Sequence, residues 1–201
     1  AKLYRQAIDR KNRLTSFLRE SSYERLDKRP NVTIYTGAGS FISPNMIKVS
    51  LPDGDIALQG KEIFINPGST PIIPAIDGID ESRHVYTSTT LLDMDMLPQH
   101  LIVVGGGYIG LEFASMYAEF GSKVTVLESG NRFMPGNDQD IADCMKDVLE
   151  KKGIEIHLNA RAQSVHDTND GVTLTYSDVS DGTPYFVNGD AILIATGRKP
   201  M

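Results

Sequence analysis

Three glycines in one short turn carry the clearest chemical signal of this sequence. Residues 105–110 read GGGYIG, with glycine at the first, third and sixth positions. This spacing is typical of a turn that binds the pyrophosphate of a dinucleotide: Gly105 allows the turn, Gly107 opens the backbone to the phosphates, and Gly110 lets the next helix pack closely. The N–H groups at the start of that helix favour an anion. The predicted cofactor-binding residues here are Gly105, Gly106, Gly107, Tyr108, Ile109 and Gly110.

An acidic residue stands about 20 residues beyond the glycines, where a carboxylate accepts hydrogen bonds from the adenosine ribose. This residue is Glu128. A 2′-phosphate would meet a like charge there, at about 1 kcal/mol in water and up to about 4 kcal/mol near a protein surface. We therefore expect NAD(H) to be preferred over NADP(H). Another interpretation makes Glu128 a solvated strand-end acid, and Arg132 would offset part of the repulsion.

Strands and helices alternate around this turn, as in α/β proteins. A strand (101–104) precedes the glycines, a helix (108–120) follows, and a second strand (123–128) ends at Glu128. A further helix (138–152) and strand (154–158) extend the parallel sheet. The pattern predicts a Rossmann-type NAD-binding domain over residues 98–201. Its remaining elements are an antiparallel β-meander at 162–166, 172–176 and 185–187 and a buried strand at 191–196.

The first part of the chain has a different pattern. An amphipathic helix is predicted from residue 1 to about residue 28, where apolar residues recur at helical spacing, and Pro30 ends it. Short stretches with strand character follow, separated by turn-forming residues, and they predict a small β-meander. The Pro-, Ser- and Thr-rich segment 67–98 is interpreted as a crossover between domains. The predicted strands are 32–35, 46–51, 55–58 and 62–66.

Motifs along nearly the whole chain resemble those of the class I pyridine nucleotide-disulfide oxidoreductases, which include lipoamide dehydrogenase, glutathione reductase and mercuric reductase. Within that family, RKNRLTSFLRE at 10–20, together with IFIN at 63–66 and GGGYIGLEFAS at 105–115, is most similar to the reactive-chlorine-resistance and hypothiocyanous acid reductase subgroup. The resemblance implies that residues 1–97 are part of an FAD-binding domain and that residues 98–201 bind NAD(H). The matching motifs are GGGYIGLEFAS (105–115), GSKVTVLE (121–128), ATGRKP (195–200), TGAGSF (36–41), IFINPGSTPIIP (63–74) and STTLL (88–92).

The resemblance implies roles for two residues at the start of the helix after the glycines. Tyr108 matches the tyrosine that gates the nicotinamide pocket beside the flavin, and Glu112 matches the acid near the nicotinamide. Helical spacing places both on one face. The alternative is that Tyr108 packs at the helix start and Glu112 is a solvated acid favoured by the helix dipole.

Other positions are implied to touch the cofactors through the backbone or a small side chain. Gly197 and Ala162 would contact NAD, Gly39 would approach the FAD adenine, and Gly68 and Ser69 would lie near the flavin. Pro67 departs from the threonine usual before that glycine, which removes an N–H group and a hydroxyl.

The family's electron transfer from FAD requires a cysteine pair spaced C-x4-C, and this chain has a single cysteine. Cys144 falls in a predicted helix and is interpreted as partly packed against the sheet. The first FAD fingerprint, the later Gly-Asp motif and the His-Glu pair of the dimerisation domain are also missing. We therefore expect a piece lacking both ends of its parent protein, inactive by itself on disulfides.

Composition excludes several classes of function. The net charge of −6 argues against a nucleic-acid footprint. No apolar run approaches the roughly 20 residues that span a membrane. The four histidines, His84, His100, His157 and His166, lack metal-site spacing, so no metal is expected. A single cysteine favours a reducing, cytoplasmic compartment, and the family resemblance implies a homodimer through a missing C-terminal domain.

The predicted function is delivery of hydride from NADH to FAD within an FAD-dependent NAD(P)H oxidoreductase. Three alternatives remain open. One is an NADH oxidase or peroxidase with a single redox cysteine or none. Another is a non-catalytic NAD-sensing module, against which the FAD-domain motifs argue. The third is a folding unit without activity of its own.

Overall fold

The computed structural model describes residues 2–201. The chain forms two compact units: one combines the residues up to Ile8 with Ser69–Met201, and the other comprises Asp9–Gly68. This division rests on packing, whereas the predicted boundary at residue 97 concerns which cofactor each part binds.

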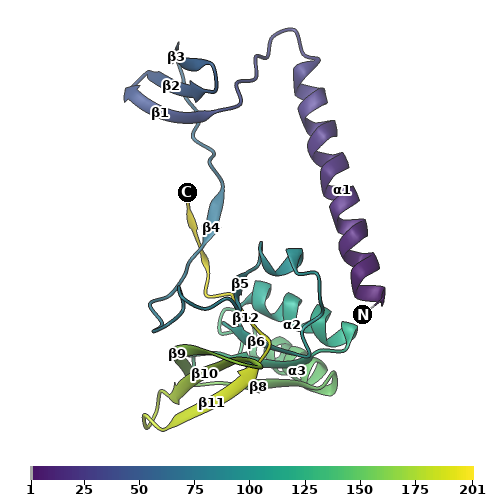
Figure 1. The fold of residues 1–201 in the computed structure, drawn as a ribbon. Helices are drawn as coiled ribbons and strands as arrows, with labels where there is room; N and C mark the ends of the chain where they lie inside the picture. The colour runs from purple at the N-terminus through teal and green to yellow at the C-terminus, as the bar shows by residue number, and fades with distance from the viewer. Residues whose placement is uncertain (1) are drawn as a thin grey trace. The chain divides into compact units, whose positions relative to one another are not determined.

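A five-stranded parallel sheet forms the centre of the larger unit (Figure 1). Every neighbouring pair in this sheet is parallel. Parallel strands are buried on both faces, which explains the continuous apolar runs of the sequence. In spatial order the strands are β5 (Val85–Thr87), β12 (Ala191–Ile194), β6 (His100–Val104), β7 (Lys123–Leu127) and β8 (Ile154–His157).

Two layers cover this sheet (Figure 1). Alternate residues of its strands pack against one layer or the other. Leu101 and Val103 pack with α2 (Tyr108–Phe120) and α3 (Gln139–Lys151). Ile102 and Val104 pack with the antiparallel meander. The meander consists of β9 (Ala160–Thr168), β10 (Gly171–Asp178) and β11 (Pro184–Gly189). The predicted α/β fold with a parallel sheet and an antiparallel meander is confirmed.

The segment 67–98, interpreted as a crossover, also contributes strands. β5 forms one edge of the parallel sheet by pairing with β12. β4 (Ser69–Pro71) pairs antiparallel with β13 (Arg198–Pro200). A 3-10 turn (η1, Leu91–Asp93) completes the segment. Strands of three residues are too short to show a pattern in sequence.

Helix α1 (Lys2–Asp27) begins in the larger unit through one buried side chain, Tyr4. The Tyr4 hydroxyl group donates a hydrogen bond to the carbonyl oxygen of Met94 (3.1 Å) and lies 3.2 Å from that of Tyr117. The Tyr117 hydroxyl group donates to the carbonyl oxygen of Leu91 (3.0 Å). Polar groups this deeply buried need such partners.

The smaller unit contains an antiparallel sheet of β1 (Ala38–Ser43), β2 (Met46–Leu51) and β3 (Gly54–Gln59). The predicted strands at 32–35 and 62–66 are wrong, because neither segment forms a strand in the structure. β1 was not predicted, since its sequence AGSFIS has weak strand propensity. Pairing with β2 forms it.

Within residues 2–201, no helix has both the length and the apolar character that crossing a membrane requires.

Candidate dinucleotide-binding site

The glycine turn joins the end of β6 to the start of α2. Gly105 has a φ of +109°, and an added Cβ would lie 2.5 Å from the carbonyl oxygen of Ala195, so only glycine fits. An added Cβ on Gly110 would collide with the carbonyl oxygen of Gly105, so α2 packs closely on the turn. Gly107 is the N-cap of α2, and the space beside its Cα holds no atom within 4 Å. The geometry leaves the helix N-terminus open to an anion.

A pocket of about 460 Å³ lies against this turn, at the carboxyl ends of β6, β7 and β12. Ligands of open α/β sheets bind at this edge. A second hollow of about 240 Å³ shares Gly105, Ser129 and Thr196 with it and continues toward Ala160 and Ala162. The first pocket is lined by Gly105, Gly107, Tyr108, Ile109, Glu128, Ser129, Ala195, Thr196, Gly197 and Arg198.

Glu128 directly follows β7, and its carboxylate turns toward the glycines. One oxygen, Oε2, accepts a hydrogen bond from the N–H group of Gly106 (2.7 Å). The other, Oε1, accepts one from the N–H group of Gly130 (2.7 Å). The Arg132 guanidinium instead donates to the side chain of Gln139 (2.8 Å), at the start of α3. The structure thus brings Glu128 and the glycine turn together.

Tyr108 and Glu112 lie one turn apart on α2 and are both exposed. The Tyr108 hydroxyl group donates a hydrogen bond to the side-chain oxygen of Asn137 (2.9 Å). Both residues line a third hollow of about 570 Å³ between α2 and α3, whose wall is mostly apolar. Tyr108 also lines the pocket at the glycine turn, so it stands between the two spaces.

The remaining predicted residues fall in different places. Gly197 lines the pocket at the glycine turn, and Ala162 lines the adjoining hollow. Ser69 accepts two hydrogen bonds from the Arg198 guanidinium: its Oγ from Nε (2.8 Å) and its carbonyl oxygen from Nη2 (2.5 Å). Gly39, in β1, and Gly68 belong to the other compact unit.

Sequence reasoning missed several residues around the pocket. The motif ATGRKP had marked the segment, yet only Gly197 was assigned from it. The signal was available, because a strand parallel to β6 ends directly before Ala195. Gly130 does not belong to the glycine pattern of the sequence. Its contact with Glu128 is seen only in the folded turn after β7. The other missed residues are Ser129, Ala195, Thr196 and Arg198.

His100 and Cys144 lie outside the pocket at the glycine turn. His100, at the amino end of β6, contacts the Thr125 hydroxyl group through Nε2 (2.8 Å). Burial, and then the nearby charge of Lys123, lowers the pKa of His100. Cys144 is exposed on α3, so the expectation that it packs against the sheet is wrong. Across the described part of the chain, no three His, Cys, Asp or Glu side chains are placed to hold a metal ion.

Comparisons with known proteins agree with this architecture. The family model for pyridine nucleotide-disulphide oxidoreductases matches residues 1–201. The probable pyridine nucleotide-disulfide oxidoreductase RclA of Escherichia coli K12 is 41% identical over 197 residues, which cover 97% of this chain and 43% of RclA. Dihydrolipoyl dehydrogenase of Geobacillus stearothermophilus is 35% identical over 177 residues, which cover 88% of this chain and 37% of that protein.

Solved structures give the same result. The HOCl-induced flavoprotein disulfide reductase RclA from Escherichia coli superposes with a TM-score of 0.90 at 40% identity, over 98% of this chain and 43% of that one. LpdA from Mycobacterium tuberculosis superposes with a TM-score of 0.83 at 30% identity, over 97% of this chain and 42% of that one. The chain therefore spans less than half the length of these relatives.

Proposed function

Because this chain belongs to the pyridine nucleotide-disulphide oxidoreductase family, we propose that residues 98–201 bind NAD(H) and that residues 1–97 form part of the FAD-binding domain. In the whole protein, an FAD-dependent oxidoreductase, the NAD(H) domain would present NADH to the flavin. The similar proteins include a flavoprotein disulfide reductase and dihydrolipoyl dehydrogenases, which supports this reaction class.

One observation carries the proposal: an open helix N-terminus and a fixed carboxylate face the same pocket. The glycine turn offers backbone N–H groups and space for a pyrophosphate, and Glu128 offers acceptors for ribose hydroxyl groups. The residues present therefore fit a dinucleotide.

The chemistry that the cofactor supplies when bound is a hydride at the nicotinamide ring. The residues of this chain would hold the dinucleotide in position. The backbone of residues 105–107 holds the pyrophosphate, Glu128 fixes the adenosine end, and the backbone at Gly197 and Ala162 supports the dinucleotide along the sheet edge.

Tyr108 and Glu112 are proposed to lie on the nicotinamide side of the pocket. Tyr108 lines both neighbouring spaces, which suits a side chain that moves aside when the ring enters. The Glu112 carboxylate would lie near the nicotinamide ring. Stopped-flow reduction of the flavin by NADH in the whole protein, compared with a Glu112→Ala variant, tests this role: an unchanged rate would remove Glu112 from the reaction.

The preference for NAD(H) over NADP(H) follows from the charge of Glu128. We expect calorimetric titration of the 201-residue chain to show NADH binding at least several-fold more tightly than NADPH. Glu128→Ala should narrow that difference, because it removes both the ribose acceptor and the repulsion of a 2′-phosphate. Absence of NADH binding to the folded chain would contradict the proposed site. A difference that Glu128→Ala leaves unaltered would contradict the role of the carboxylate.

Two further features of the whole protein remain predictions. The family resemblance favours a homodimer, which light scattering of the whole protein would test. A cytoplasmic location is expected, and fractionation of cells that produce the whole protein would test it.

A further inference from the structure

The Glu128 carboxylate is held by two backbone N–H groups from two different turns. We propose that the residues that supply them, Gly106 and Gly130, are positioning residues that set the nucleotide preference of the site through Glu128. This inference rests on the proposed NAD(H) site and adds the structural origin of its selectivity.

The contacts fix the acidic residue at both ends. Gly106 and Gly130 each donate to one carboxylate oxygen at 2.7 Å, the length of a charge-assisted hydrogen bond. The main chain of Glu128 is fixed as well, because its N–H group donates to His157 (2.8 Å) and its carbonyl oxygen accepts from Ala160 (2.9 Å). A long flexible side chain is thereby confined to one position.

Confinement changes what the carboxylate does to a ligand. Each oxygen keeps further lone pairs, so the same two atoms can still accept hydrogen bonds from ribose hydroxyl groups. A mobile glutamate would swing into solvent when a 2′-phosphate arrived, and would then discriminate weakly. A glutamate held by two amides can move away only by giving up both bonds. The like-charge repulsion is therefore retained.

A side chain at either glycine position would press on Glu128 itself. A Cβ added to Gly106 would lie 3.1 Å from Cβ and 3.1 Å from Oε2 of Glu128. A Cβ added to Gly130 would lie 3.2 Å from Oε1. Neither glycine has a positive φ, so alanine introduces no backbone strain. The nearest group that each alanine side chain would meet is therefore Glu128.

The first experiment measures the affinities of the 201-residue chain for NADH and NADPH. Gly106→Ala and Gly130→Ala should each weaken NADH binding roughly tenfold, since hydrogen bonds to a charged group are at stake. The affinity for NADPH should fall less than that for NADH, or should rise, so the preference for NADH over NADPH decreases. Adding Gly130→Ala to a Glu128→Ala chain should leave the selectivity unchanged, because the group through which the glycine acts is gone.

Two other glycines provide matched controls. Gly136 also lacks a positive φ and any atom within 4 Å of an added Cβ, so Gly136→Ala should bind both nucleotides normally. Gly107 shares these properties but faces the proposed pyrophosphate position. Gly107→Ala should therefore weaken both nucleotides equally. Selectivity that stays at the wild-type value in both Gly106→Ala and Gly130→Ala would overturn the inference.

A measurement without nucleotide separates the inference from the proposed function. In a chain labelled with ¹⁵N-glycine, Glu128→Gln removes the charge while keeping the size of the side chain. We expect the amide resonances of Gly106 and Gly130 to shift and that of Gly136 to stay in place. Unshifted resonances would overturn the inference even if NADH binds. Shifted resonances in a chain that binds neither nucleotide would support the hold on the carboxylate, and the proposed function alone would fail.

Discussion

Tyr117 is fully buried, and its hydroxyl group has two hydrogen-bonding partners, the Tyr4 hydroxyl group and the carbonyl oxygen of Leu91. Replacement by phenylalanine would keep the ring packing and remove the donor to the carbonyl oxygen of Leu91. We expect Tyr117→Phe to lower the free energy of unfolding by about 1–2 kcal/mol, measured by urea denaturation. The exposed Tyr185 serves as the control, and Tyr185→Phe should be close to neutral. Equal stabilities of the two variants would contradict the role of the hydrogen bond.

Tyr117 also makes the stability of the wild-type chain depend on pH. Burial, with the Tyr4 hydrogen bond as a second cause, raises the pKa of Tyr117 above its ordinary value of 10.0. The unfolded chain therefore ionises first, and stability that is fully present below about pH 10 is lost as the pH rises further, by about 1.4 kcal/mol per pH unit. Urea denaturation at about pH 9 and about pH 11 should show a smaller loss for Tyr117→Phe than for the wild type. Equal losses would show that Tyr117 does not ionise on unfolding.

At the level of individual residues, spacing in the sequence predicted part of the candidate site. The G-x-G-x-x-G pattern and the acid after the second strand identified Gly105, Gly107, Gly110 and Glu128, because βα turns place such residues at fixed offsets. Gly130 could not be found in this way. Its amide meets Glu128 only after the turn that follows β7 has folded back.

Helix α2 ends in a conformation that suits glycine alone. Gly121 has a φ of +101°, and its N–H group donates to the carbonyl oxygen of Ala118 (2.9 Å). No atom lies within 4 Å of an added Cβ, so alanine would meet backbone strain and no collision. We expect Gly121→Ala to lower the free energy of unfolding by about 1 kcal/mol. Thermal denaturation with Gly136→Ala as the control tests this, and matching unfolding temperatures would refute it.

Elements with strong periodicity were predicted well, and those that depend on a distant partner were not. The helix at 108–120 matches α2 in both bounds. Its caps are glycines, which sequence shows directly. Residues 62–66 (EIFIN) have the apolar character of a strand, but Phe64 and Ile65 are 88% and 72% exposed, and the segment belongs to no strand. β5 was missed, because three residues become a strand only beside β12.

The two compact units differ in how much apolar surface they bury. Residues 9–68, all of them described, contain one buried side chain, that of Val49. The larger unit contains two extended clusters of buried side chains. Amides of β1–β3 should therefore exchange with deuterium at least tenfold faster than those of β6 and β7, since local opening exposes little apolar surface. Hydrogen exchange followed by mass spectrometry measures this, and uniform protection would contradict it.

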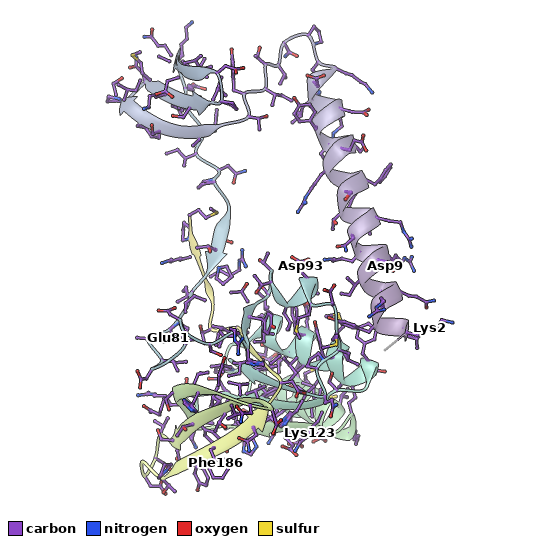
Figure 2. All side chains as sticks on the ribbon, in the orientation of Figure 1. Lys2, Asp9, Glu81, Asp93, Lys123 and Phe186 are labelled. Carbon is purple, nitrogen blue, oxygen red and sulfur yellow. The ribbon has the colours of Figure 1, made fainter. Side chains whose placement is uncertain are left out.

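Exposed apolar side chains occur in both units (Figure 2). Apolar residues of α1 beyond its first turns are exposed, with Phe17 at 64% and Leu14 at 53%. On β11, the labelled Phe186 is 72% exposed as well (Figure 2). Sequence periodicity identified the apolar face of α1, but it carried no information on what lies against that face.

The pairing of β4 with β13 has a consequence for how such a chain is assembled. Ser69 lies opposite Pro200, and Pro71 lies opposite Arg198, so residues 72–197 start and finish side by side. A stretch whose two ends are neighbours is an insertion: it can be added to a host chain, or removed from it, without stretching the host. The pocket proposed to bind the dinucleotide lies almost wholly on this insertion, with Arg198 just outside it. The candidate site therefore lies on one stretch of chain whose ends are adjacent, and joining residue 71 to residue 198 through a short turn would remove that stretch while leaving the two strands in register.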